Sequence, residues 1–249
     1  MIYTAIWAHR GASAYAPENT LPAFLLAERL GSDGIELDVQ ITKDKQVVVC
    51  HDHNIDRTSN GTGNICDMTL EELKQYDFGY PTAFGHRFAG TKISTLGELY
   101  EAVKASDMIV NVELKYTAAQ PDTVALTLAV TEQHGMKDRV IYSSFAHYGL
   151  EAVMKLDSTA VVAPLYGDME NACEAALAYG ALALHPAHSA AVKPGYINEA
   201  HLKGLRVHPY TIDNPAIMQE LLNLGADALI TNYPDIAKGL RDKHLKKFI

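Results

Sequence analysis

The chain has 249 residues, of which 48% are hydrophobic and 20% are charged, and its formal net charge at neutral pH is -9. This length suffices for one large α/β domain with a substantial core, and the acidic balance argues against a broad nucleic-acid-binding surface, which needs a basic patch. A few local cations or a metal could still bind a phosphate group.

The three cysteines, Cys50, Cys66 and Cys173, lie far apart without a CxxC pair. Neither a disulfide framework nor a thiolate zinc site is therefore expected. The N-terminal segment lacks the basic start of a secretory signal, and no apolar run approaches the roughly 20 residues of a membrane span. We expect a soluble cytoplasmic protein without a stable membrane anchor.

Short β-branched or apolar runs alternate with amphipathic stretches along the whole chain. Strands are expected at 3–9, 33–40, 107–114, 139–145, 159–166, 181–188, 205–211 and 227–232. Helices are expected at 20–31, 94–104, 121–134, 147–156, 168–179, 194–203, 214–224 and 233–243. This alternation predicts one (β/α)₈ TIM barrel over residues 1–249, with a small insertion after the second strand. A doubly wound open sheet is the alternative, but no GxGxxG loop follows an early strand.

The insertion occupies much of residues 43–93, an interval too long for a simple connection. It contains an edge hairpin and a short helix that a capping box of Thr69 and Glu72 should open. A second capping box, Thr95 with Glu98, should begin the next outer helix. Insertions that follow a barrel strand lie on the catalytic rim, so this one could form a wall or a lid.

The second strand has an acidic face. Side chains alternate along a strand, so Glu36 and Asp38 point to one side while Ile35, Leu37 and Val39 point to the other. In a barrel wrapped by helices the apolar face packs outward, which leaves the polar face in the barrel mouth.

The third strand repeats this alternation, with Asn111, Glu113 and Lys115 on one face. Its carboxylate should converge with Glu36 and Asp38, and crowded buried acids require a cation. Oxygen ligands without cysteine favour Mg²⁺ or Ca²⁺ over structural zinc. A network of ion pairs with Lys115 and Arg10 is the alternative.

Two histidines should reach the same rim. His9 ends the first strand and is followed by Arg10 and by Gly11, which permits a sharp turn, while His51 follows the hairpin. An unperturbed imidazole titrates at about pH 6.5, so the pair could act as general acid and base. Arg10 and Lys115 suit a phosphate, the first as a bidentate fork and the second as a point charge.

The segment after the first strand reads PENTLPAF. Asn19 or Thr20 is a suitable helix N-cap, and Pro22 fits the first turn. Glu18 could ligate a metal, orient an imidazole or favour the helix dipole, and the sequence leaves these roles open.

Other residues are expected near the rim. Phe145 and Tyr210 could form an apolar wall of the site or belong to the core. His185 and His208, each followed by proline at a strand end, could contact substrate or simply form turns.

Several motifs together resemble the glycerophosphodiester phosphodiesterase family: HRG, PENT, the ExD of GIELDVQ, HD at 51–52, ELK at 113–115 and GADALITNYPD near the end. The resemblance covers essentially the whole chain. It implies a TIM barrel with a small insertion after the second strand, and hydrolysis of small glycerophosphodiesters to glycerol 3-phosphate and an alcohol.

The resemblance also implies roles for particular residues. These are His9 and His51 as acid and base, Glu36, Asp38 and Glu113 as ligands of a divalent metal, Mg²⁺ or Ca²⁺, and Arg10 with Lys115 as phosphate-binding residues. Family members commonly carry a tryptophan-threonine pair in the seventh strand, where this chain has Tyr210 and Thr211. The contacts to the organic groups of the substrate are therefore not implied.

Two other functions fit the same residues. One is a phosphodiesterase for intact lipids, of the lysophospholipase D or phosphoinositide phospholipase type, which the aromatic insertion at 76–88 favours. The other is a non-catalytic barrel that binds phosphodiesters. The sequence leaves open the preferred alcohol, the metal, the acid and base assignment, a water or a cyclic-phosphate route, and the oligomeric state.

Overall fold

The computed structural model describes residues 3–116 and 120–246. Eight parallel strands form its central ring: β1 (Ala5–His9), β2 (Gly34–Ile41), β4 (Ile109–Leu114), β5 (Val140–Ser144), β6 (Val161–Tyr166), β7 (Ala183–Pro186), β8 (Arg206–Val207) and β9 (Ala228–Thr231). Their order is β8-β7-β6-β5-β4-β2-β1-β9. The amide of Asp227 donates to Val207 O (3.0 Å) and that of Ile212 to Ile230 O (2.9 Å), which brings the two end strands together. The predicted barrel is thus confirmed.

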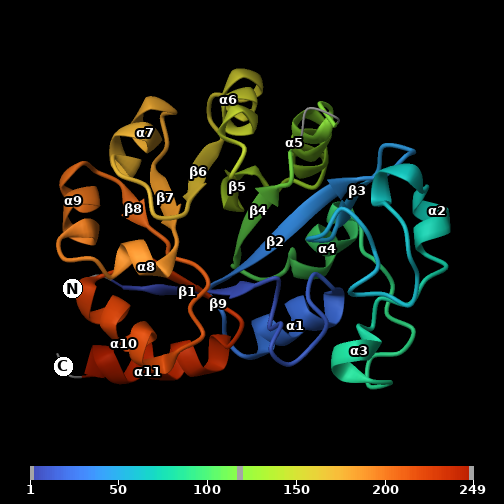
Figure 1. Ribbon diagram of the computed structural model, residues 1–249, viewed down its shortest axis with the longest axis horizontal. Helices are drawn as coiled ribbons and strands as arrows, with labels where there is room; N and C mark the ends of the chain where they lie inside the picture. Colours follow the sequence, from blue (N-terminus) through green and yellow to red (C-terminus); the bar gives the residue numbers. More distant parts are fainter. Residues whose placement is uncertain (1–2, 117–119, 247–249) are drawn as a thin grey trace.

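Helices surround the strands (Figure 1). They are α1 (Leu21–Arg29), α4 (Leu96–Val103), α5 (Thr123–Gln133), α6 (His147–Leu156), α7 (Ala172–Ala178), α8 (His188–Ala191), α9 (Tyr196–Leu202), α10 (Pro215–Leu224) and α11 (Pro234–Lys246). Outward-facing strand residues such as Leu37 and Val112 are buried in the main hydrophobic cluster. Phe24 and Leu99 supply the helix side of that cluster. The apolar face of each strand therefore packs outward, as expected. None of the helices in the described part of the chain is long and apolar enough to span a bilayer.

The insertion lies beside β2 and contains β3 (Val47–Val49), a 3₁₀ turn η1 (Ile65–Asp67), α2 (Leu70–Leu73) and α3 (Pro81–Phe84) (Figure 1). β3 pairs antiparallel with β2, so the expected hairpin uses β2 as its first strand. Both expected capping boxes form, with Thr69 Oγ1 accepting from Glu72 N (3.2 Å) and Thr95 Oγ1 from Glu98 N (3.1 Å). The insertion has its own small core, made of Val48, Cys50, Ile55, Ile65, Leu73, Phe78 and Ile93.

Several element boundaries differ from the expectation, and the strand expected at 205–211 is reduced to Arg206–Val207. The strand expected at 181–188 ends at Pro186, and α8 begins at His188. Proline has no amide hydrogen for a further ladder bond, which favours this early end. The helix expected at 168–179 begins only at Ala172, because Asn171 has the left-handed conformation (φ 60°).

Indole and imidazole side chains fill the barrel interior below the mouth. Trp7 lies two residues before His9 on β1, and its ring centre is 4.6 Å from that of His208 and 6.0 Å from that of His185. His185 Nε2 and His208 Nδ1 are 3.0 Å apart. Gly34 is required beside the indole, because a Cβ there would lie 2.8 Å from Trp7 Cδ1. This layer closes the barrel below the mouth.

Candidate active site

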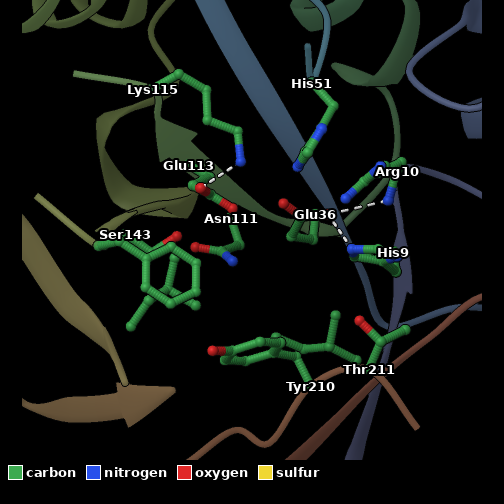
Figure 2. Close-up of a pocket in the computed structure, with 13 residues that line it drawn as sticks. His9, Arg10, Glu36, His51, Asn111, Glu113, Lys115, Ser143, Tyr210 and Thr211 are labelled. Carbon is green, nitrogen blue, oxygen red and sulfur yellow. Dashed lines mark hydrogen bonds and ion pairs between the residues drawn. The ribbon is translucent and has the colours of Figure 1, made fainter. Parts of the chain in front are cut away.

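A cavity of about 240 Å³ opens at the carboxyl ends of the barrel strands (Figure 2). It is lined by His9, Arg10, Glu36, His51, Asn111, Glu113, Lys115, Ser143, Phe145, Leu165, Tyr210, Thr211 and Ile230. Every residue predicted for the site is in this set except Asp38, which is fully buried and contacts Arg10 and Lys115. The structure therefore brings the predicted residues together at one mouth.

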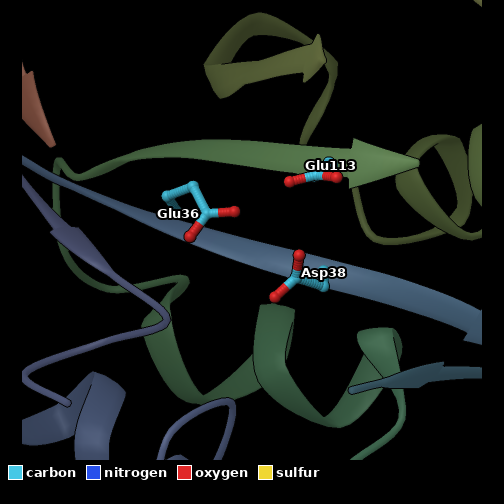
Figure 3. Close-up of side chains that lie close together, drawn as sticks. All are labelled: Glu36, Asp38 and Glu113. Atoms are coloured by element: carbon cyan, nitrogen blue, oxygen red, sulfur yellow. The ribbon is translucent and has the colours of Figure 1, made fainter. Parts of the chain in front are cut away.

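The acidic face of β2 meets the acid of β4 inside the barrel. The strand register pairs Asp38 with Glu113, and Glu36 lies two residues before Asp38 on the same face. One carboxylate oxygen from each of the three side chains lies within 4.8 Å of the others (Figure 3). All three side chains are buried, so the acidic face of the second strand points away from solvent.

The three carboxyl groups have very different electrostatic environments. Burial, reinforced by Asp38, raises the pKa of Glu36 well above its usual range and that of Glu113 to about 7. Burial would also raise the pKa of Asp38, but Lys115 and Arg10 hold it well below its usual range. Lys115 Nζ is 2.9 Å from Asp38 Oδ1 and also bonds Glu113, while Arg10 Nε is 3.4 Å from Asp38 Oδ2.

The donor set suits a hard divalent cation. Three carboxylates face two permanent cations, Arg10 and Lys115, so the cluster has one negative charge in excess when all its acids ionise. A divalent ion would favour the charged forms of Glu36 and Glu113, whose pKa values are raised without it. Carboxylate oxygens without sulfur are the ligands of Mg²⁺ and Ca²⁺. The residues present therefore fit such an ion.

His9 is held by a neutral amide. Its Nδ1 is 2.8 Å from Asn232 Oδ1, and its Nε2 is 3.9 Å from Glu36 Oε2. The amide of Asn232 is itself oriented, because its Nδ2 donates to Asp213 Oδ2 (2.6 Å). A carbonyl oxygen only accepts, so Nδ1 of His9 carries the hydrogen and Nε2 is free to accept. Burial and then Arg10 lower the pKa of His9 to about 4, which keeps the ring neutral.

His51 is held by a carboxylate instead. Its Nδ1 is 2.6 Å from Asp52 Oδ1, and Asp52 Oδ2 accepts from Arg57 Nε (2.7 Å). The hydrogen bond from Arg57 is the main reason that the pKa of Asp52 falls to about 2. Asp52 therefore remains charged and accepts the hydrogen on Nδ1 of His51.

Arg57 extends this network to the phosphate-binding candidate Arg10. Its two terminal nitrogens donate to Glu18 Oε2 (2.7 Å) and Oε1 (2.8 Å), and Glu18 Oε1 also accepts from Arg10 (2.8 Å). Glu18 thus pairs with two guanidinium groups. This role differs from the three that the sequence leaves open, which are binding a metal, orienting an imidazole and favouring the helix dipole. Arg10 has the left-handed conformation (φ 55°), and its amide donates to Glu36 Oε2 (3.0 Å).

The turn after β1 corrects the interpretation of Asn19. Thr20 occupies the N-cap position of α1, but its hydroxyl donates to Pro17 O (2.6 Å) and does not cap the helix. Asn19 has φ 57° and donates from Nδ2 to Asp38 Oδ2 (2.8 Å). Its amide therefore orients a carboxylate of the acidic cluster.

The remaining candidates separate into two groups. Phe145 and Tyr210 line the cavity with ring centres 5.9 Å apart, and the Tyr210 hydroxyl donates to Tyr166 O (2.9 Å). His185 and His208 do not line the cavity, because they lie in the buried layer with Trp7.

The sequence analysis did not predict an orienting role for four residues of the site: Asn19, Asp52, Arg57 and Asn232. Asp52 directly follows His51, Asn19 belongs to PENT and Asn232 to GADALITNYPD, whereas Arg57 lies in none of the quoted motifs. Asn232 pairs with a histidine 223 positions away, and Arg57 with an acid 39 positions away.

Comparisons with known proteins agree with this fold. The model of the Glycerophosphoryl diester phosphodiesterase family matches residues 9–236. A glycerophosphodiester phosphodiesterase of Caldanaerobacter subterraneus subsp. tengcongensis is 38% identical over 93% of this chain and 95% of its own length.

Solved structures are similar over the whole barrel. An Oleispira antarctica phosphodiesterase in complex with its product sn-glycerol-3-phosphate has 30% identity and a TM-score of 0.90, covering 96% of this chain and 97% of its own. A glycerophosphodiester phosphodiesterase from Agrobacterium tumefaciens has 28% identity and a TM-score of 0.83, covering 95% and 99%. Since the family match spans nearly the whole barrel and its mouth, this chain belongs to the glycerophosphoryl diester phosphodiesterase family and is an enzyme of that class.

Proposed function

We propose that the protein hydrolyses glycerophosphodiesters to glycerol 3-phosphate and an alcohol, using a divalent cation, Mg²⁺ or Ca²⁺, held by Glu36, Asp38 and Glu113. The observation that carries this proposal is the placement of two histidines with different partners on one cavity beside a buried acidic cluster. The product bound to the Oleispira antarctica phosphodiesterase supports the same substrate class. When bound, the cation would supply positive charge to stabilise the phosphate oxygens as the reaction proceeds.

Arg10 and Lys115 would bind the phosphate group. Both line the cavity and both contact Asp38, so their positive groups are held at one side of the acidic cluster. Bonds to Glu18 and Glu113 restrain the same two side chains. Restrained cations lose little freedom when they engage a phosphate, which favours binding and orientation.

The different partners of the two histidines suggest different roles. His9 is neutral and presents Nε2, so it is suited to take a proton from the nucleophile. His51 instead bonds the charged carboxylate of Asp52 through Nδ1, and we assign to it the protonation of the departing alkoxide. The nucleophile would be water or the adjacent glycerol hydroxyl, and both need a base at the same place.

The aromatic insertion gives no separate support for a lipid substrate. The ring centres of Tyr80 and Phe84 are 6.1 Å apart, and those of Phe84 and Phe88 are 5.4 Å apart. Both pairs pack edge to face, so these side chains contact one another within the insertion.

Release of glycerol 3-phosphate tests the proposal. The assay uses glycerophosphocholine and glycerophosphoethanolamine, each with EDTA, Mg²⁺ or Ca²⁺. We expect no release with EDTA and restored release with at least one cation. Release that is unchanged by EDTA would contradict the metal assignment. Binding of both diesters without turnover under any cation would instead support the non-catalytic barrel, and turnover of lysophospholipids alone would support the lipid alternative.

A further inference from the structure

Two buried polar side chains line the cavity without taking part in the networks described above. Asn111 on β4 and Ser143 on β5 are 1% and 0% exposed. Neither Asn111 Oδ1 nor Ser143 Oγ has a hydrogen-bond partner among the described residues. Both belong to the cavity wall in Figure 2, on the side away from His9.

Buried polar atoms without partners are costly, so a position that only needed to be filled would favour an apolar side chain. The inward-facing positions just below them on these strands follow that rule, with Ile109 on β4 and Ile141 on β5 packed against the layer of Trp7. Asn111 and Ser143 each lie two residues beyond one of these isoleucines, at the level of the acidic cluster. Their polar atoms therefore fit an occupant that brings its own hydrogen-bonding groups.

The register sets these side chains beside the acids. Asn111 is the strand partner of Glu36, and Ser143 is the strand partner of Glu113. A phosphate held at the acidic cluster would thus have its organic substituent next to both side chains. The hydroxyl groups of that substituent would meet an amide and a hydroxyl, which can each donate and accept.

Other parts of the cavity lining are apolar. Leu165 and Ile230 belong to this lining, together with the ring of Tyr210, whose hydroxyl is already bonded to Tyr166 O. A substituent that fits this cavity therefore carries both hydroxyls and C–H groups. The cavity of about 240 Å³ is small, so it takes a short group and leaves a larger alcohol outside.

We infer that Asn111 and Ser143 form the recognition site for the free hydroxyls of the glycerol group, a vicinal diol attached to the phosphate. This inference rests on the proposed function, because it places the phosphate at the acidic cluster. It accounts for selection of the glycerol side of the diester, and it predicts that the other alcohol is selected much less strictly.

Competitive inhibition tests the site without requiring turnover of the ligand. The two probes are sn-glycerol 3-phosphate and propyl phosphate, which has the same chain without the hydroxyls. They are compared in Mg²⁺ and in Ca²⁺, by inhibition of diester hydrolysis and by calorimetric binding. We expect wild type to prefer glycerol 3-phosphate roughly 10-fold or more, because each hydroxyl that makes a hydrogen bond contributes roughly 3- to 10-fold.

Two variants and one control test whether Asn111 and Ser143 cause the preference for glycerol 3-phosphate. Ser143→Ala removes a single oxygen and should lower the preference roughly 3- to 10-fold, and Asn111→Leu should lower it at least as much. Both should leave the affinity for propyl phosphate within about 3-fold of wild type, since that ligand has no hydroxyl to lose a bond. Ser144→Ala is the control, because Ser144 is equally buried on the same strand but donates to Leu114 O (2.7 Å).

Each result decides the inference. Equal binding of the two phosphates by wild type, as expected if the polar wall holds only water, would overturn it. A preference that persists in both variants would overturn it as well. Diester turnover without a hydroxyl preference would support the proposed function and reject this recognition site. A hydroxyl preference without diester turnover would support the recognition site and reject the proposed function.

Discussion

Replacement of Arg57 by alanine should impair catalysis although Arg57 does not line the main cavity. Its guanidinium bonds Asp52, the partner of His51, and Glu18, the partner of Arg10. One side chain from the insertion thus restrains both a histidine and an arginine of the mouth. Without it, Asp52 and Glu18 each keep a single partner, and the side chains that they hold gain freedom.

The expected fall in kcat depends on which hydrogen bonds the Arg57→Ala substitution removes and which it leaves in place. A correctly placed general acid contributes roughly 10² to 10⁴ to the rate, but Asp52 still bonds His51 in the variant, so we expect a loss of roughly 10- to 100-fold in kcat. Arg57 is 38% exposed, which screens its ion pairs. We therefore expect a loss of only about 1–2 kcal/mol in the free energy of unfolding, or about 3–6 °C in Tm, and a folded protein.

Steady-state kinetics on glycerophosphocholine, with added guanidinium ion, checks this role. The free ion should restore part of kcat in Arg57→Ala, because it can occupy the space between the two carboxylates, whereas added ammonium should restore less. Arg87→Ala is the matched control, since Arg87 belongs to the same insertion and lies over the ring of Phe88 (5.0 Å). A folded Arg57→Ala protein with wild-type kcat would refute the positioning role.

Three further outcomes are expected. Glu113→Ala should abolish the metal-dependent rate while circular dichroism shows a retained fold, and an unchanged metal requirement would contradict the ligand assignment. His51→Ala should lower kcat at least roughly 10²-fold, and a loss of a few-fold would leave it only a positioning role. Burial lowers the pKa of His185 to about 3, so the unfolded state binds more protons below about pH 6.5 and stability falls on acidification. From this group alone, urea unfolding should show about 2 kcal/mol less stability at pH 5 than at pH 8, and His185→Phe should reduce that dependence.

The parts of the site that could be predicted are those set by strand alternation. Glu36, Asp38 and Glu113 were predicted to share the inner face, because alternation needs only the local sequence and a strand boundary correct to within a few residues. The capping boxes at Thr69 and Thr95 are local for the same reason, since donor and acceptor are three residues apart.

Contacts between distant segments could not be predicted in this way. Local rules favour Asn19 or Thr20 as a helix cap, yet the amide of Asn19 binds Asp38, because a fully buried carboxylate without hydrogen-bond donors is costly. Arg57 and Glu18 lie in two different loops, and nothing in either loop indicates the other. Orienting contacts of this kind depend on how the insertion folds back on the first turn.

The depth of a side chain inside the barrel is a third kind of information. Alternation states that a residue points inward, but the stagger between neighbouring strands decides whether it reaches the mouth or the buried layer. His185 and His208 point inward at strand ends and still lie below the cavity, against Trp7. Asn111 shares the inner face with Glu113, and only its pairing with Glu36 reveals that it reaches the cavity. Specificity for the organic part of the substrate depends on such depth, which explains why the sequence indicates the phosphate chemistry more readily than the group that the enzyme selects.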